Sequence, residues 1–178
     1  MAERVERLAA DWPDGRDVLL VDLNGWVWPS ELEIEWFTAF VAADARHAGD
    51  ATIRAFAAAM LEHRCAYVAA WGPACERVHL LFDEAYVNWP SHRMSRRWRR
   101  WRISWSEEIP FLMTSHHDDS LASALWYAAY VAWPSGDGYH EDRRPGLVAF
   151  VESPVRDEVR ELLLDRERLK RLGEADEE

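Results

Sequence analysis

The sequence predicts an α/β fold: a small three-layer, Rossmann-like sandwich of about four mainly parallel strands with helices on both faces, plus an Arg/Trp-rich insertion. Two observations predict it. Near-continuous apolar runs of strand length, which are typical of strands buried on both faces, alternate with stretches of helical periodicity. Such alternation favours βαβ units with right-handed crossovers, and therefore a parallel sheet. The length of 178 residues suits a single domain over residues 1–178.

The first fifty or so residues are predicted to supply two helices and one strand. Residues 1–12 carry apolar side chains at helical spacing, which predicts a short leading helix. The apolar run at 18–23 predicts the first buried strand. Ser30, followed three residues later by Glu33, forms a capping box, so we expect a second helix from residue 30 to about residue 47.

The remainder of the chain repeats the order of strand and helix. Gly72-Pro73 and Ser153-Pro154 each place a proline where a helix can begin, because the first helical residue needs no partner for its N–H. The acidic tail, residues 173–178, is expected to fray. The other expected elements are a helix at about 50–63, strands at 65–71, 111–115 and 146–151, and helices at about 73–87, about 120–133 and from 153 onward.

Composition and charge narrow the classes of function. The formal net charge of −11 argues against sequence-independent binding of nucleic acid, which needs cations against the phosphates. No apolar run approaches the ~18 residues that span a bilayer, and the charged N-terminus lacks the apolar core of a signal peptide. The 2 cysteines are too few for a disulfide framework. We therefore expect a reduced, cytoplasmic protein with no membrane partner.

Two blocks of the sequence resemble a known family. They are Cys65-Ala-Tyr-Val-Ala-Ala-Trp-Gly-Pro-Ala-Cys-Glu-Arg-Val-His79 with Phe82-Asp83-Glu84, and Phe111-Leu-Met-Thr-Ser-His-His-Asp-Asp-Ser-Leu121 with Ala124-Leu125-Trp126. On these blocks, and through residues 146–163, the chain is similar to a family of small bacterial domains of unknown function. The resemblance implies no activity, so it assigns no roles to residues. The Arg/Trp-rich segment and about the first sixty residues lie outside its pattern.

Four residues near the carboxyl ends of predicted strands are candidate catalytic residues. Cys75 lies in the first turn of a predicted helix, where the helix dipole favours a thiolate, and His79 follows one turn later. A thiolate beside an imidazole is the minimum for nucleophilic catalysis. His117 and Asp118 follow the third strand, where an open α/β sheet binds its ligands. The alternative for Cys75 is a small, half-buried apolar side chain.

The same cluster allows a metal site. One of the two histidines after the third strand, with Asp118 and His79, would make a His/His/Asp ligand set. Alternatively, Asp118, Asp119 or Ser120 caps the following helix and the histidines fill space. We expect neither a resident metal nor any other cofactor.

Residues 88–110 differ from the rest of the chain in composition, because they are rich in arginine and tryptophan. We interpret them as an insertion or arm. Three interpretations are open: single-stranded nucleic-acid stacking, a membrane-surface helix, or an arm whose arginines pair with carboxylates while its tryptophans anchor a contact. The acidity of the chain and the lack of a clean apolar face favour the third. The candidate partner-binding residues are Arg96, Arg97, Trp98, Arg100, Trp101 and Trp105.

Missing signatures limit the enzymatic hypotheses. The sequence has no Walker-type phosphate loop, no Gly-x-Gly-x-x-Gly, no Gly-x-Ser-x-Gly and no His-Glu-x-x-His. Our first hypothesis is a non-catalytic or regulatory module of accessory or immunity type, which binds a protein partner through a tryptophan-rich surface and could also self-associate. The second is a small hydrolytic or nucleotide-handling enzyme with a Cys/His/Asp cleft, with or without a metal. The sequence does not decide whether the protein is an enzyme.

Overall fold

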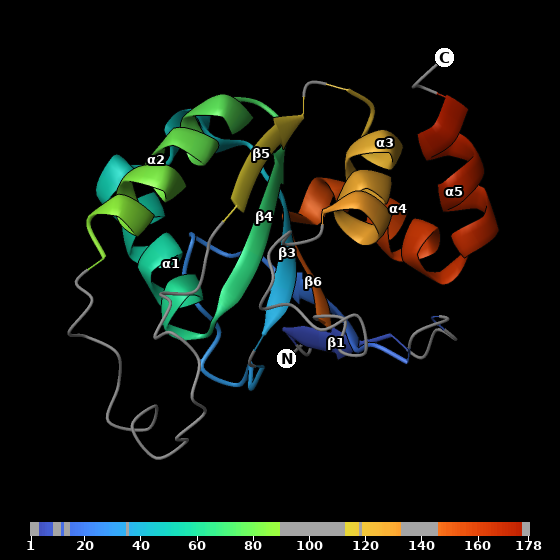
Figure 1. Ribbon diagram of the computed structural model, residues 1–178, viewed down its shortest axis with the longest axis horizontal. Helices are drawn as coiled ribbons and strands as arrows, with labels where there is room; N and C mark the ends of the chain where they lie inside the picture. The colour runs from blue at the N-terminus through green and yellow to red at the C-terminus, as the bar shows by residue number, and fades with distance from the viewer. Residues whose placement is uncertain are drawn as a thin grey trace, which may run out of the picture.

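A computed structural model of the protein describes residues 4–8, 12, 15–34, 36–89, 113–117, 119–132 and 146–175. These residues form a six-stranded sheet in the order β1-β2-β6-β3-β4-β5, with helices on both faces (Figure 1). The three-layer α/β prediction is therefore confirmed. The strands are β1 (Val5–Arg7), β2 (Val18–Asp22), β3 (Phe37–Ala42), β4 (Cys65–Trp71), β5 (Met113–His117) and β6 (Gly146–Val151).

The sheet is parallel apart from one edge. The short strand β1 pairs antiparallel with β2, whereas every other pair of neighbouring strands is parallel. The carboxyl ends of the parallel strands lie at the top of Figure 1, where the chain leaves β5 for the next helix.

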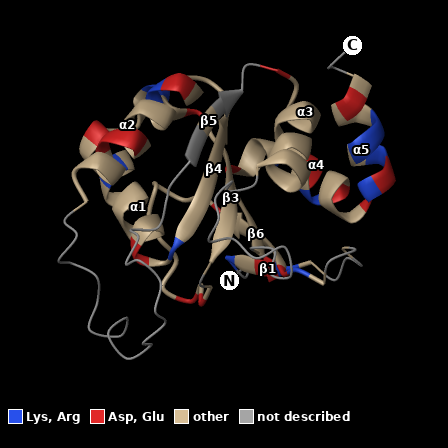
Figure 2. Ribbon diagram, in the orientation of Figure 1, with Lys and Arg blue, Asp and Glu red and all other residues tan. Residues whose placement is uncertain are grey.

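Helices cover the two faces unequally. One face carries α1 (Asp50–Glu62) and α2 (Cys75–Val87), and the short 3-10 helix η1 (Ala45–His47) precedes them. The other face carries α3 (Leu121–Trp126), its π-helical continuation η4 (Tyr127–Val131), α4 (Ser153–Leu164) and α5 (Arg166–Ala175). Charged residues decorate α2 and α5, whereas β3 and β6 have none (Figure 2).

Side chains of the central strands alternate between two hydrophobic cores. Phe37 of β3 and Phe150 of β6 point toward α1 and α2, where they join Phe56 and Phe82. Their neighbours in the strands point the other way, into a core made mainly of alanine and leucine side chains from α3, η4, α4 and α5. Because both faces are covered, the central strands read as unbroken apolar runs.

The predicted helix at 30–47 is wrong. Residues 23–34 have no regular secondary structure and residues 37–42 form the central strand β3, in which all the residues are buried. The side chain of Ser30 bonds Glu31 rather than capping a helix. Burial of an aromatic and β-branched run between β6 and β4 outweighs the local capping signal.

The start of the chain also departs from prediction. The expected helix at 1–12 contains the edge strand β1 instead, because Val5 to Arg7 pair with β2. Of the tail that is expected to fray, residues 173–175 belong to α5, and residues 176–178 lie outside the described residues. Gly173 lies against Trp126 of α3 so closely that an added Cβ would stand 2.2 Å from the indole Cγ, so the start of the tail is held by packing. The predicted insertion at 88–110 lies outside the described residues beyond Trp89.

Candidate binding groove

A helix-free crossover, which we call the strap (residues 23–34), leads from β2 toward β3 over the face that carries α1. It begins with a sharp turn, since Gly25 and Trp26 both have positive φ, 66° and 58°. A bulky side chain in this backbone region costs about 1–3 kcal/mol and persists only where the surroundings enforce it. The buried indole of Trp26, 5% exposed, packs edge-to-face with the Phe56 ring, with ring centroids 5.8 Å apart, and this contact offsets that cost.

Consecutive side chains that follow the turn point to different sides of the strap. The ring of Trp28 stacks on the His63 ring with centroids 4.3 Å apart, and its centroid lies 5.7 Å from that of the Phe150 ring. Trp26 and Trp28 thus both turn toward the core. Val27 between them turns outward and is 55% exposed.

The strap is held from both sides. The Nη2 of Arg4 donates to the carbonyl oxygen of Val27 at 2.6 Å, and its Nε donates to the carbonyl oxygen of Asp22 at 3.2 Å. Leu23 N–H donates to the Val151 carbonyl at 2.8 Å and so continues the β2–β6 ladder into the strap. Hydrogen bonds therefore anchor the strap to Arg4 on one side and to β6 on the other.

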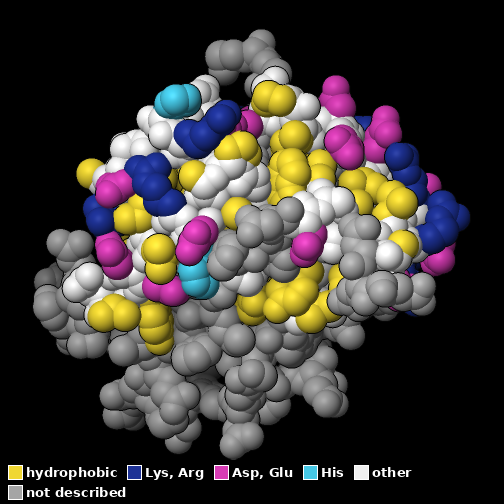
Figure 3. All heavy atoms as spheres, turned by 90° about the horizontal axis from the view of Figure 1, so that it is seen from above, with side chains coloured by type: hydrophobic (Ala, Val, Ile, Leu, Met, Phe, Trp, Pro, Cys, Tyr) yellow, Lys and Arg dark blue, Asp and Glu magenta, His cyan; other side chains and the backbone are white. Residues whose placement is uncertain are grey.

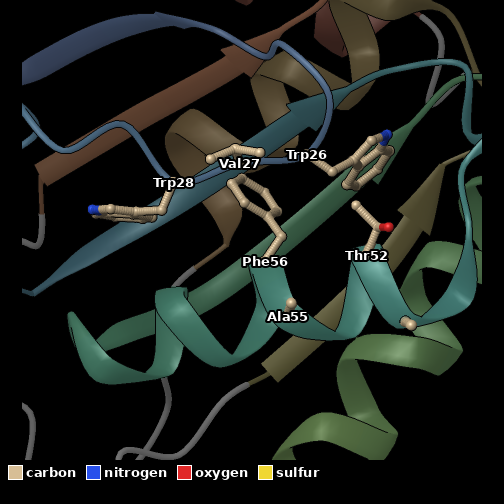
Figure 4. A pocket seen from close by; sticks show the side chains of 7 residues that line it. Trp26, Val27, Trp28, Thr52, Ala55 and Phe56 are labelled. Atoms are coloured by element: carbon tan, nitrogen blue, oxygen red, sulfur yellow. The ribbon is translucent and has the colours of Figure 1, made fainter.

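An apolar groove of about 430 Å³ runs between the strap and α1 (Figure 4). The Phe56 ring and the Thr52 side chain rise from α1 toward the strap residues on the opposite wall. We call this the strap groove, and it is lined by Trp26, Val27, Trp28, Ala51, Thr52, Ala55 and Phe56. Its volume lies in the range of about 300–1,000 Å³ that is typical of ligand sites.

The lining of the strap groove defines what it can do. None of its residues titrates near neutral pH, and the Thr52 hydroxyl is the one polar group that its side chains supply besides the indole N–H groups. General acid–base and nucleophilic catalysis both need a titratable or activated group. The groove is therefore suited to taking up an apolar side chain rather than to carrying out a reaction.

The position where open α/β sheets commonly bind ligands is bridged by the protein itself. Chain connections diverge at neighbouring strands β3 and β6, since β3 leads to α1 on one face and β6 to α4 on the other. There a carboxylate oxygen of Glu152 accepts from the backbone N–H of Asp44 at 2.9 Å, and Glu152 N–H donates to the Ala42 carbonyl at 3.0 Å. The guanidinium of Arg46 lowers the pKa of Asp44 to about 2, so this residue is ionised throughout the physiological range.

Acidic and basic side chains are mixed on this end of the molecule. The view from above shows both signs interspersed with hydrophobic side chains (Figure 3). At the next strand, Arg156 of α4 is paired with Asp22 and also bonds Glu6 at 3.0 Å. These carboxylates are engaged in holding β1, β2 and α4 together.

Cys75 and His79 lie on consecutive turns of α2, as predicted. Cys75 is the first residue of the helix and is 4% exposed, and it forms no disulfide. The Nε2 of His79 is 3.4 Å from a carboxylate oxygen of Asp83, one turn further on. The other cysteine, Cys65, is fully buried in β4, and this burial raises the pKa of its thiol far above the usual range.

The remaining predicted site residues are only partly placed. His117 ends β5 opposite Trp71 of β4, so its backbone lies at the same edge of the sheet as Cys75, but its side chain lies outside the description. Ser120 is the N-cap of α3 and accepts from Ser123 N–H at 3.1 Å, which confirms the helix-capping alternative for that residue. Among the described residues no group of three or more His, Cys, Asp or Glu side chains could hold a metal ion. Asp118 and the arm residues Arg96, Arg97, Trp98, Arg100, Trp101 and Trp105 lie outside the described residues.

Comparison with known proteins places the chain in a family. Residues 26–166 match the model of a domain of unknown function, DUF7684. The chain belongs to this family. Its match begins at Trp26, so the DUF7684 domain includes residues 26–34 of the strap, α1 and β3, which the sequence resemblance had left out. The chain matches no curated protein and no solved structure.

The lining residues of the strap groove were missed by the sequence-based reasoning. The capping box at Ser30 and Glu33 drew residues 30–47 into a helix and left the preceding residues unassigned. The pattern Trp26-Val27-Trp28 after the turn signal Asn24-Gly25 could have revealed them. An apolar residue between two aromatic residues in an extended chain indicates two anchored rings and one outward side chain.

Proposed function

We propose that this DUF7684 protein is a non-catalytic or regulatory protein-binding module, and that the strap groove takes up an apolar side chain of its partner. One observation carries the proposal: the groove is apolar, contains no titratable lining residue and is bordered by the exposed side chain of Val27. Binding energy at protein interfaces concentrates where apolar anchors enter desolvated pockets beside aromatic residues.

We also propose a wider role for the protein. In the described ranges no helix is long and apolar enough to cross a membrane. We propose an accessory or immunity-type protein of a bacterial cytoplasm, with the Arg/Trp-rich arm at 88–110 as a second contact region. The proposed role of the arm rests on its sequence alone.

A selection for peptides tests the binding role. A random peptide library displayed on phage is selected on the wild-type 178-residue chain, and the affinity of the enriched peptides is then measured for the wild type and for the variant Val27→Glu. The carboxylate that this substitution introduces would stand at the mouth of the strap groove and oppose entry of an apolar side chain. We expect enriched peptides whose affinity falls at least tenfold on Val27→Glu, which corresponds to about 1.4 kcal/mol.

The matched control is Leu164→Glu, because Leu164 is a comparable exposed aliphatic side chain, 43% exposed, on the opposite face of the sheet. It should leave peptide affinity unchanged. Peptides that bind both variants as tightly as the wild type would contradict the proposal.

The second candidate function is the hydrolytic or nucleotide-handling enzyme built on Cys75, His79, His117 and Asp118. The pair His79–Asp83 and the place of Cys75 in the first turn of α2 favour it. Alkylation by iodoacetamide separates the two candidates. A nucleophilic Cys75 would react faster than a free thiol at the same pH, whereas the burial of Cys75 predicts slow alkylation in the folded protein and normal alkylation in denaturant.

A further inference from the structure

We infer that the partner segment that enters the strap groove is cationic as well as apolar, with its Lys or Arg side chains at the Trp28 end of the groove. This inference rests on the proposed function and specifies the partner of the same site. It comes from the charges that flank the groove, which differ at its two ends.

Three glutamates lie close in the sequence to Trp28 or to its stacking partner His63. The ring of Trp28 stacks on His63, which directly follows α1, so the strap passes the C-terminal end of that helix here. Glu31 and Glu33 follow Trp28 in the strap, and Glu62 is the last residue of α1. All three glutamates are exposed.

These carboxylates are not neutralised by the described part of the chain. Glu31 accepts from the hydroxyl of Ser30 at 3.3 Å, which does not compensate its charge. Within the described ranges, Glu31, Glu33 and Glu62 take part in no ion pair. A basic side chain here would gain attraction without displacing an existing partner.

The Trp26 end of the groove is different. Asp50, which precedes the groove residues Ala51 and Thr52, is paired with Arg77, and Arg54 lies 3.9 Å from it. Arg54 in turn bonds Glu84 of α2 at 2.8 Å. The carboxylates at this end are therefore paired within the protein. The guanidinium of Arg4, which bonds the carbonyl oxygens of Asp22 and Val27, adds a positive charge, so this end offers little to a basic side chain of a partner.

The two ends together orient the partner. The apolar side chain occupies the space beside Val27 and Ala55, and the basic residues extend toward Glu31, Glu33 and Glu62. The formal net charge of −11 for the whole chain adds long-range attraction for the same kind of segment.

The amino-acid composition of the peptides that the wild-type protein enriches tests whether the partner segment is cationic. We expect Val27-dependent sequences that combine one large apolar residue with Lys or Arg on one side of it. Their affinity should fall when the salt concentration rises from about 50 to about 500 mM, because exposed charges are then screened.

A charge variant and its control give the direct test. The triple variant Glu31→Gln, Glu33→Gln, Glu62→Gln should bind the best enriched peptide roughly threefold to tenfold more weakly, with a reduced salt dependence. The control Glu76→Gln, Asp157→Asn, Glu158→Gln removes the same charge from exposed positions on α2 and α4 and should bind like the wild type.

The possible outcomes separate the two proposals. Val27-dependent peptides that lack basic residues, or that bind the two triple variants equally, overturn the charge inference and leave the groove as a binding site. Failure to enrich any Val27-dependent peptide overturns both. Val27-dependent dimerisation of the protein in sedimentation velocity would overturn the inference by making a second copy the occupant.

Discussion

The two faces of the sheet are covered in different ways, and the difference explains where the candidate site lies. On one face, helices α3, α4 and α5 bury a core rich in alanine and leucine. On the other, α1, α2 and the strap pack on the sheet among the described residues, and the strap contributes two tryptophans. Large aromatic residues fill that core, with Phe37, Phe56, Phe82 and Phe150 all nearly inaccessible.

A helix carries side chains all around its axis and packs tightly against neighbouring helices. In the strap, by contrast, consecutive side chains point to different sides. Trp26 and Trp28 reach the core, while Val27 faces solvent and the wall of α1 lies across from it. The groove thus lies where the strap, which has no helix, crosses α1.

The largest effect is expected for Phe56→Ala. Phe56 is 1% exposed and its ring lies 5.2 Å from Phe150 and 6.4 Å from Phe82, so truncation leaves a cavity in the aromatic core. We expect the free energy of unfolding to fall by about 3–5 kcal/mol in urea titration. The variant should also lose peptide binding at the strap groove.

Leu162→Ala is the comparison on the opposite face. Leu162 of α4 is 2% exposed, and its truncation should cost about 2–5 kcal/mol. Peptide affinity should be unchanged. Equal loss of binding in both variants would mean that binding does not distinguish the two faces.

Next in size is Gly173→Ala. The added Cβ would overlap the Trp126 indole, so α5 and α3 must move apart. Overpacking of this kind costs about 1–3 kcal/mol. Hydrogen exchange should accelerate in α5 while the amides of α1 keep their protection, and a uniform increase over both helices would contradict the local role of this contact.

A smaller, pH-dependent effect is expected for Tyr67→Phe. The hydroxyl groups of Tyr67 in β4 and Tyr127 in η4 lie 3.0 Å apart, and burial raises the pKa of Tyr67 to about 12. The folded state therefore holds a proton that the unfolded chain releases near pH 10, and stability is lost as the pH rises from about 10 to about 12. Wild-type protein should lose about 1–2 kcal/mol more over this interval than Tyr67→Phe in urea titrations, and parallel losses would contradict the buried hydroxyl pair.

The smallest effect on stability is expected for Val27→Glu. Since Val27 is 55% exposed, the free energy of unfolding should change by no more than about 0.5 kcal/mol. This variant separates binding from folding. A large destabilisation would show that Val27 supports the core rather than the surface of the groove.

Most of the sheet could be predicted from the sequence, for a physical reason. The runs at 18–23, 65–71 and 146–151 are apolar almost without interruption, and such runs become strands buried on both faces. The helices at Asp50 and Ser153 were likewise indicated, the first by helical spacing and the second by proline at its start. Strand β3 was not predicted, because a buried apolar run is compatible with either a strand or a helix. The nearby capping box favoured a helix, which is wrong.

The site was less predictable than the fold. Cys75 and His79 stood out because their chemistry is conspicuous, whereas a groove of Trp, Val, Ala and Phe has no distinctive residue type. It exists only because the strap lies across α1, and that contact joins segments that are separated by β3 in the chain. Only the turn at Asn24-Gly25 and the Trp-Val-Trp pattern carried local information about it.

The most direct measurement uses the tryptophan side chains as reporters on both faces. Indole N–H resonances of ¹⁵N-labelled protein are assigned by Trp→Phe substitution and followed while the best Val27-dependent peptide is added. We expect the Trp26 and Trp28 resonances to shift in proportion to the bound fraction, while those of Trp12 and Trp126 in the core of the other face keep their positions. Shifts at Trp12 or Trp126, or at the arm residues Trp98, Trp101 and Trp105, with Trp26 and Trp28 unmoved, would contradict binding at the strap groove.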